Sequence, residues 1–225
     1  MKFTFYGHAS FAVDIAGKTL LFDPFISPNP AASAIDIQQL SADYIFVSHG
    51  HTDHVADVVA IAQRTGAIVV GGVEAVNWLK DQGVPHIHEM NFGSCTFDFG
   101  RVSFVPAAHS SSMPDGSYGG NPGGFVIATD EGNFYYAGDT SLTSEMQLVP
   151  HYAALDFAVL PIGGNYTMDA RDAVLAAQMI QCDKIIGVHY NTFPPISIDI
   201  EAAKSLFVMA NKELLLPQIG DSLIF

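Results

Sequence analysis

The chain concentrates candidate metal ligands in residues 47 to 54, VSHGHTDH. Imidazole and carboxylate groups are the ligands that suit zinc and neighbouring transition metals. His49 and His51 are two positions apart, so both side chains point the same way in an extended segment and can grip one ion. Asp53 and His54 follow where the chain bends into a helix, which would aim them at a second ion. The spacing predicts metal binding rather than a solvated, histidine-rich loop or a proton relay.

Three further candidate ligands follow apolar strands, as His49 does: His109, Asp139 and His189. In sheets covered by helices, sites assemble in the loops beyond the carboxyl ends of strands, so residues far apart in sequence can converge. A bridging Asp139, with His109 on the first side and His189 on the second, would complete two metal sites ~3.5–4 Å apart with a hydroxide between them. Taken alone, each histidine could instead be a hydrogen-bonded core or rim residue, and Asp139 could cap a turn.

The elements that must position these residues are strands and helices in alternation. Apolar residues at helical spacing predict helices over residues 55–64, 74–82, 170–180 and 200–211. Short apolar runs bounded by Gly, Pro and Asp predict strands at 3–6, 11–15, 19–22, 44–47, 68–70, 86–89, 95–99, 102–106, 125–129, 133–136, 157–162, 184–188 and 213–216. This alternation implies sheets covered by helices, and the similar order of both halves indicates two layers packed face to face.

Composition limits the classes of function. A chain of 225 residues with 49% hydrophobic and 14% charged residues predicts one compact domain over residues 1–225. The net charge of −14 repels phosphate backbones and anionic headgroups, so neither nucleic acid nor a membrane is an expected partner. No apolar stretch approaches the roughly 18 residues of a membrane span and no signal peptide is evident, so we expect a cytoplasmic protein. Cys95 and Cys182 lack C-x-x-C spacing and are expected to be buried free thiols.

The motif H-G-H-T-D-H at 49–54, with the later His109, Asp139 and His189, resembles the metallo-β-lactamase superfamily. Four other stretches are similar to the UPF0173 metal-dependent hydrolases, which are related to the lactonases that open ascorbate 6-phosphate: GHAS at 7–10, FDP at 22–24, PIGGNYTMD at 161–169 and HYNTFP at 189–194. The match spans nearly the whole chain. The resemblance implies an α/β fold, an αββα four-layer sandwich of two mixed sheets with helices outside, and a two-metal site at one edge of the sheets.

Two residues beside the first strands are candidates for supporting the site. Asp23 precedes Pro24 and could form a turn, while the resemblance implies that it orients a ligand histidine through the free ring nitrogen. His8 follows Gly7 and could be a packed histidine, whereas the family match favours the pocket rim.

Five loop residues are candidates for lining the pocket: Tyr118, Asn165, Tyr166, Asp169 and Phe193. Tyr118 belongs to residues 110–124, the only long loop of Gly, Ser and Pro, and a loop that long is usually functional. Asp169 could instead cap the helix that follows it.

Two divalent ions, with Zn²⁺ expected first and Mn²⁺, Ni²⁺ or Fe²⁺ as alternatives, would lower the pKa of a shared water to ~7. Asp53 would orient the resulting hydroxide and carry a proton to the leaving group, which makes it the predicted catalytic residue. The prediction is hydrolysis of a small ester, lactone, amide or phosphoester. The only arginines are Arg64, Arg101 and Arg171, so no phosphate clamp is evident, which weakens a sugar-phosphate lactone as substrate.

Two other functions stay open. A mononuclear iron dioxygenase can use the same scaffold. A diiron reductase is disfavoured, because its pattern has Glu where His51 stands. A non-catalytic, metal-bound scaffold would show no turnover. The expected partner is a small-molecule substrate, and a homo-oligomer is left open.

Overall fold

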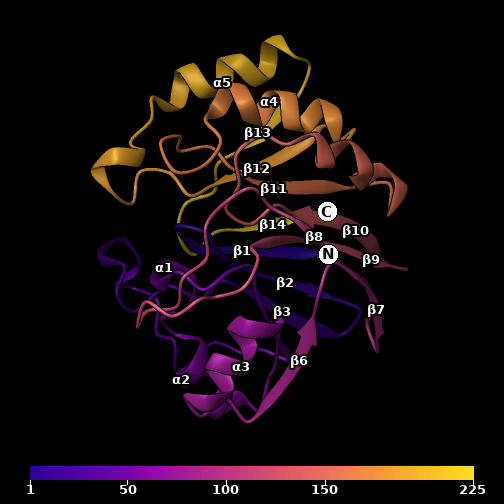
Figure 1. Ribbon diagram of the computed structural model, residues 1–225. Helices are drawn as coiled ribbons and strands as arrows, with labels where there is room; N and C mark the ends of the chain where they lie inside the picture. The colour runs from indigo at the N-terminus through magenta and orange to yellow at the C-terminus, as the bar shows by residue number, and fades with distance from the viewer.

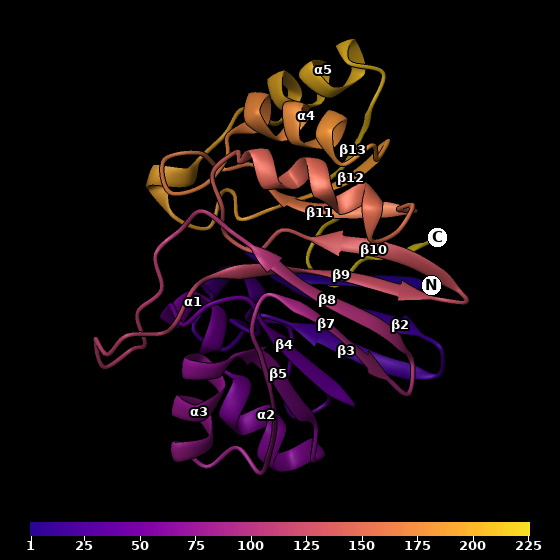
Figure 2. The same ribbon diagram turned by 45° about the vertical axis from the view of Figure 1, so that its right-hand side comes forward.

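The computed structural model describes all 225 residues and has four layers, with two β-sheets packed face to face between helices (Figures 1 and 2). Helices α2 (Val58–Thr65) and α3 (Val73–Asp81) cover the first sheet, and α4 (Ala170–Met179) and α5 (Ile200–Met209) cover the second. This arrangement is the αββα sandwich that the resemblance implies. The expectation of two similar layers packed face to face is confirmed.

The first sheet has seven strands in the order β14-β1-β2-β3-β4-β5-β6. The strands β1, β2 and β3 are antiparallel, and β3, β4, β5 and β6 are parallel, since helical segments connect β4 to β5 and β5 to β6. The strand β14 pairs antiparallel with β1 at the edge. The bounds are β1 (Lys2–Gly7), β2 (Ser10–Ile15), β3 (Lys18–Phe22), β4 (Tyr44–Val47), β5 (Ile68–Gly72), β6 (His86–Met90) and β14 (Ser222–Ile224).

The second sheet repeats this antiparallel-then-parallel pattern in the order β13-β12-β11-β10-β9-β8-β7. The strands from β7 to β10 are antiparallel, and those from β10 to β13 are parallel. The bounds are β7 (Gly93–Phe97), β8 (Gly100–Pro106), β9 (Gly123–Thr129), β10 (Gly132–Tyr136), β11 (Phe157–Pro161), β12 (Lys184–Val188) and β13 (Glu213–Leu215).

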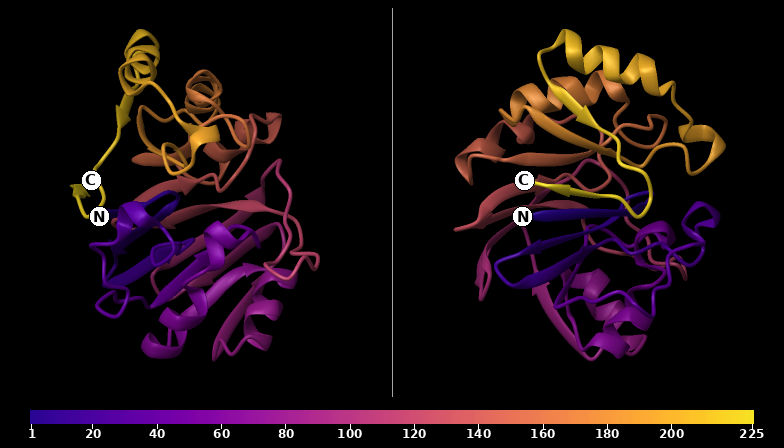
Figure 3. Two further views of the ribbon diagram at one scale, coloured as in Figure 1. Left: turned by 90° about the vertical axis from the view of Figure 1, so that its left-hand side faces the viewer. Right: turned by 180° about the vertical axis from the view of Figure 1, so that it is seen from behind.

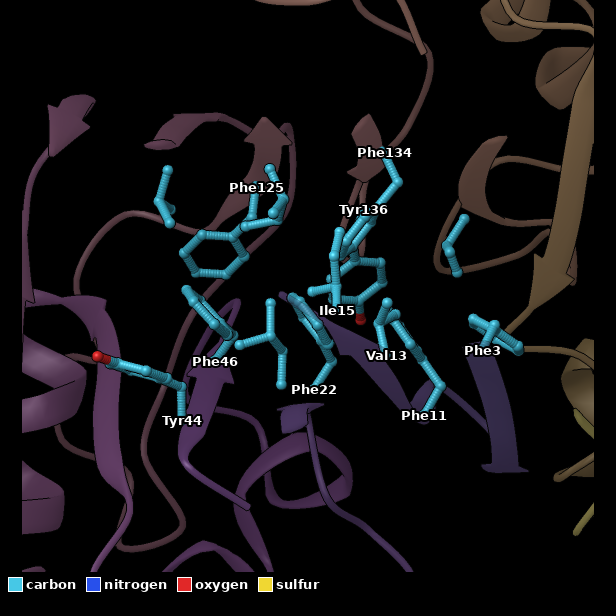
Figure 4. Packing of buried hydrophobic residues seen from close by; sticks show 14 of the residues in the cluster. Phe3, Phe11, Val13, Ile15, Phe22, Tyr44, Phe46, Phe125, Phe134 and Tyr136 are labelled. Carbon is cyan, nitrogen blue, oxygen red and sulfur yellow. The ribbon is translucent and has the colours of Figure 1, made fainter. Parts of the chain in front are cut away.

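Aromatic side chains fill the space between the two sheets (Figure 4). Phe11, Phe22 and Phe46 stack across β2, β3 and β4, with neighbouring ring centroids 4.6 and 4.9 Å apart. From the facing sheet, the ring of Tyr136 meets Phe22 edge-on at 5.7 Å and that of Phe125 meets Phe46 at 5.1 Å. Burial of each large apolar side chain contributes roughly 1.5–3 kcal/mol, so this layer fixes the relative position of the two sheets.

The helix expected over residues 55–64 is present as α2, but it begins three residues later, and a separate short helix, α1 (Thr52–Val55), precedes it. The break lies at Asp57, which is buried. Its carboxylate accepts hydrogen bonds from the backbone N–H groups of Ile26 and Ser27 at 2.6 and 2.8 Å. This tertiary contact holds the turn between the helices and ties α1 to the segment that follows β3.

The expectation that both cysteines are buried is half wrong. Cys182 is buried, whereas Cys95 on β7 is only partly buried, because β7 is the edge strand of the second sheet.

The chain ends lie side by side, at the end of the sandwich away from α1 (Figures 1 and 3). Met1 and Phe225 exchange two backbone hydrogen bonds of 3.0 Å, one in each direction. The strand β14, which the sequence patterns did not predict, brings the C-terminus there. Three 3₁₀ helices were also not predicted: η1 (Pro30–Ala32), η2 (Ser144–His151) and η3 (Pro194–Ile196). No helix of this chain has the length and apolar character needed to cross a lipid bilayer.

Candidate metal centre

Six strands end at the same edge of the sandwich, and each is followed within three residues by a candidate site residue. The pairs are β1 with His8, β3 with Asp23, β4 with His49, β8 with His109, β10 with Asp139 and β12 with His189. In Figure 2 the loop between β8 and β9 and the helix α1 extend at this edge.

The first group of candidate ligands consists of His49, His51 and His109. One nitrogen of each ring lies within 4.8 Å of those of the other two. His49 Nε2 and His51 Nδ1 are 2.9 Å apart, as the two-residue spacing predicted, and the ring of His109 lies 5.1 Å from each of the other rings. The three imidazoles can therefore face one ion.

The second group consists of Asp53, His54 and His189, with His8 as a fourth member. Asp53 and His54 belong to α1, and the ring centroid of His54 lies 4.2 Å from that of His49 in the first group. His189 lies directly after β12. His54 and His189 are buried, while the side chain of Asp53 is 30% exposed.

Asp139 lies between the two groups and is buried. Its Oδ2 is 3.0 Å from His189 Nε2 and 3.3 Å from His54 Nε2 on one side. On the other side it is 3.6 Å from His109 Nε2 and 3.9 Å from His49 Nε2. One carboxylate oxygen thus faces both groups, which is the geometry expected of a bridging ligand.

Asp23 is a completely buried carboxylate that accepts four hydrogen bonds beneath the centre. Its Oδ1 accepts from the backbone N–H of Ser48 at 2.8 Å. Its Oδ2 accepts from the Ser48 hydroxyl at 2.5 Å, from the Tyr136 hydroxyl at 2.6 Å and from His54 Nδ1 at 2.8 Å. The placement matches the orienting role that the resemblance implies.

These hydrogen bonds set the tautomers of two histidines. His54 donates through Nδ1–H to Asp23, so its Nε2 carries a lone pair toward Asp139. The Ser48 hydroxyl hydrogen is taken by Asp23, so its oxygen accepts from Nδ1–H of His49 at 2.9 Å. In their neutral forms both rings would therefore turn an unprotonated Nε2 toward the centre, which is the form that binds a metal.

Buried carboxylates and histidines dominate the electrostatics. Burial raises the pKa of Asp139, but the charges of His54 and His189 outweigh it and hold the pKa well below the usual value. Burial lowers the pKa of His54, but Asp139 and Asp23 outweigh it and raise the pKa well above the usual value. Burial, followed by the charge of His54, lowers the pKa of His49 well below the usual value. The buried carboxylates favour positive charge at their centre, and His49 favours its neutral form.

Three buried polar atoms at the centre have no hydrogen-bond partner: His54 Nε2, Asp139 Oδ1 and His189 Nδ1. Buried polar groups are nearly always paired, so such a concentration of unpaired atoms calls for a partner. A divalent cation bound among these side chains would give His54 Nε2 and the Asp139 carboxylate a partner. The residues present therefore fit the metal ions that the resemblance implies, and their role as ligands stays a prediction.

A cavity of about 400 Å³ opens onto the two groups. Two of the predicted pocket residues, Tyr166 and Phe193, line it. Its full lining is His51, Asp53, His109, Ser110, Asp139, Tyr166, His189, Phe193 and Pro195. A mixed polar and aromatic wall of this size suits a small molecule.

Three residues expected to line the pocket do not line this cavity. Asp169 caps α4 instead, since its Oδ1 accepts from the backbone N–H groups of Arg171 and Asp172 at 2.8 and 3.0 Å. Asn165 occupies an exposed turn with a φ of 60°, a conformation that asparagine tolerates well. Tyr118 is 65% exposed and points its hydroxyl to Asn121, because its loop extends away from the cavity.

Several site residues were missed by sequence reasoning. Ser48 and Tyr136 hold Asp23, Thr192 contacts His8, and Ser110 and Pro195 line the cavity. Ser48 and Tyr136 carried a weak signal, since each lies at the end of a strand that leads to a candidate ligand. Ser110 belongs to the loop 110–124 that was expected to be functional, and Thr192 and Pro195 lie in or beside the family-like stretch 189–194, but none of the three was singled out because serine, threonine and proline are common in loops.

Comparisons with known proteins identify the family and the fold of this chain. The family model described as the beta-lactamase superfamily domain matches residues 18–190. A UPF0173 metal-dependent hydrolase from Flavobacterium johnsoniae is 51% identical over 224 residues, which is 99% of each chain. Among solved structures, Igni18, a metallo hydrolase from Ignicoccus hospitalis, is 32% identical with a TM-score of 0.88 over 99% of this chain and 97% of that one. An isothiocyanate hydrolase from Delia radicum gut bacteria has a TM-score of 0.83 at 20% identity, covers 100% of this chain and 99% of its own, and shares the fold alone.

Proposed function

Since the chain belongs to the UPF0173 metal-dependent hydrolase family of the beta-lactamase superfamily, we propose that this enzyme hydrolyses a small ester, lactone, amide or phosphoester at a dinuclear metal centre. Metal-dependent hydrolysis is the activity of the family. The dinuclear centre, the nucleophile and the substrate are the proposal.

The position of Asp139 carries the proposal. Its Oδ2 lies 3.0 to 3.9 Å from imidazole nitrogens of both ligand groups. A single ion would use one of the groups and leave buried histidines of the other unpaired. Two groups around one carboxylate argue for two ions and against the mononuclear iron dioxygenase alternative.

When bound, two divalent ions supply a hydroxide near neutral pH by lowering the pKa of a shared water to ~7, and they polarise the oxygen of the attacked group. Asp53 lines the cavity from the second group, so its partly exposed carboxylate can orient the attacking water and pass a proton to the leaving group. Burial raises the pKa of Asp53, but the hydrogen bond from His8 and the charge of His54 lower it below the usual value. The lowered pKa favours the ionised carboxylate of Asp53, which is the form that can orient a water molecule.

We propose zinc as the first candidate for both ions, because the donor set is rich in imidazole nitrogen and contains only two carboxylates. Manganese, nickel and iron(II) can use the same donors.

The substrate is proposed to be a small molecule with an apolar or aromatic portion, which Tyr166, Phe193 and Pro195 would contact. No lysine or arginine belongs to the cavity lining. This lining gives no support to phosphorylated lactones as the preferred substrates.

The direct test is to strip the purified protein with a chelator, reload it with Zn²⁺ or Mn²⁺, and screen lactones, activated esters, thioesters and phosphodiesters. The proposal expects turnover only in the reloaded protein, with about two ions per chain by elemental analysis.

The variant Asp53→Ala is expected to lower kcat by roughly 10²–10⁴-fold, because it removes the group that orients water and transfers the proton. His86→Ala, at an exposed histidine on β6, is the matched control and should keep full activity. Activity that survives complete chelation, or an Asp53→Ala variant within a few fold of wild type, would contradict the proposal.

A further inference from the structure

His8 occupies a backbone conformation that few residues adopt. It lies in the turn between β1 and β2, directly after Gly7, with a φ of 53°. A positive φ is uncommon outside glycine, and such strained positions cluster at functional sites. The His8 carbonyl also accepts a hydrogen bond of 2.9 Å from the backbone N–H of His189, so the backbones of the two residues are tied together.

The side chain of His8 is buried and contacts the second ligand group. Its Nε2 lies 3.1 Å from Asp53 Oδ2, and its Nδ1 lies 2.9 Å from the Thr192 hydroxyl. With Nε2–H donating to the carboxylate, Nδ1 accepts from Thr192, so both ring nitrogens are satisfied. The ring also packs against that of His189, with centroids 4.2 Å apart.

We propose that His8 is a positioning residue that holds Asp53 in its orientation for the second metal ion. The segment carrying Asp53 is only four residues long, and α1 has no side-chain hydrogen bond at its N-terminus. The side chain of Asp53 is partly exposed, so packing alone restrains it less than it restrains a fully buried side chain. The bond from the fixed ring of His8 supplies that restraint. This inference rests on the proposed function for the role of Asp53 as a ligand.

Two substitutions separate this hydrogen bond from a merely structural role. In His8→Asn the amide reaches the place of Nδ1, so the variant can keep the contact with Thr192 but loses the contact with Asp53. Asparagine also tolerates a positive φ, so the turn is not strained. In His8→Gln the longer side chain places its amide near the position of Nε2 and can still donate to Asp53. A role in the turn alone would favour Asn over Gln.

The experiment titrates Zn²⁺ into the metal-stripped full chain and measures each dissociation constant by calorimetry with a competing chelator. Removal of a group that orients a metal ligand typically weakens binding by about 10–100-fold. We expect a loss of this size in His8→Asn for one of the two ions, with the other ion within threefold of wild type. We expect His8→Gln to recover most of the loss and His86→Asn to match wild type. Circular dichroism of each stripped variant verifies the fold.

Two results overturn the inference while leaving the proposed function intact: His8→Asn binding both ions with wild-type affinity, or His8→Gln failing as badly as His8→Asn. A wild-type chain that binds one ion at most would contradict the dinuclear centre itself, and the inference would fall with it.

Discussion

At the residue scale, one buried carboxylate is hydrogen-bonded to both groups of candidate ligands. Asp23 accepts from His54 directly and is linked to His49 through the Ser48 hydroxyl, so it orients one histidine ring of each group. The Tyr136 hydroxyl adds a further donor from the opposite sheet. The resemblance implied a role for Asp23 toward one histidine. Its second connection was not predicted, because the position of Ser48 directly after β4 is only a weak signal of a role in the site.

The variant Asp23→Asn is expected to weaken zinc binding by about 10–100-fold, because an amide cannot accept from all the donors that the carboxylate accepts. The donor left without a partner should lower the free energy of unfolding by about 1–3 kcal/mol. Calorimetric titration with Zn²⁺ and urea unfolding measure the two effects. Asp14→Asn, at an exposed carboxylate on β2, is the control. Wild-type zinc affinity in Asp23→Asn would contradict the orienting role.

At the element scale, the site depends on where strands end and helices begin. The strand-terminal positions of His49, His109, Asp139 and His189 were predictable, because apolar runs that stop at a polar residue mark the ends of buried strands. The interruption between α1 and α2 was not predictable. It depends on hydrogen bonds that the Asp57 carboxylate accepts from a segment about 30 residues earlier, and helical periodicity carries no information about them. The strand β14 was missed for a similar reason, since three residues show no useful alternation.

The variant Asp57→Ala tests the link between α1 and the segment after β3. It leaves the backbone N–H groups of Ile26 and Ser27 without their acceptor, so the free energy of unfolding should fall by about 2–3 kcal/mol. Asp57→Asn keeps one acceptor oxygen and should recover part of this loss. Asp81→Ala, at the exposed end of α3, should stay within about 0.5 kcal/mol of wild type in the same urea titration. If Asp57→Ala lowers the free energy of unfolding no more than Asp81→Ala does, the link between α1 and the segment after β3 contributes little to stability.

At the scale of the whole molecule, the centre lies where the two sheets meet. His49 and His51 follow a strand of the first sheet, whereas His109, Asp139 and His189 follow strands of the second. The aromatic layer between the sheets therefore stabilises the fold and also holds the candidate ligands of the two sheets at their distances from one another. The sequence patterns predicted two layers but not their relative placement, because a run of apolar residues does not specify which rings it will meet. The convergence of these residues at one edge was predicted from their positions after strand ends, and the resemblance supported that prediction.

The central claim is that these side chains hold two ions bridged by Asp139. Anomalous diffraction at the zinc edge, from crystals of the zinc-loaded protein, tests it most directly. The account predicts two peaks about 3.5–4 Å apart, one among His49, His51 and His109 and the other among Asp53, His54 and His189, with Asp139 contacting both. A single peak, or two peaks of which Asp139 contacts only one, would contradict it.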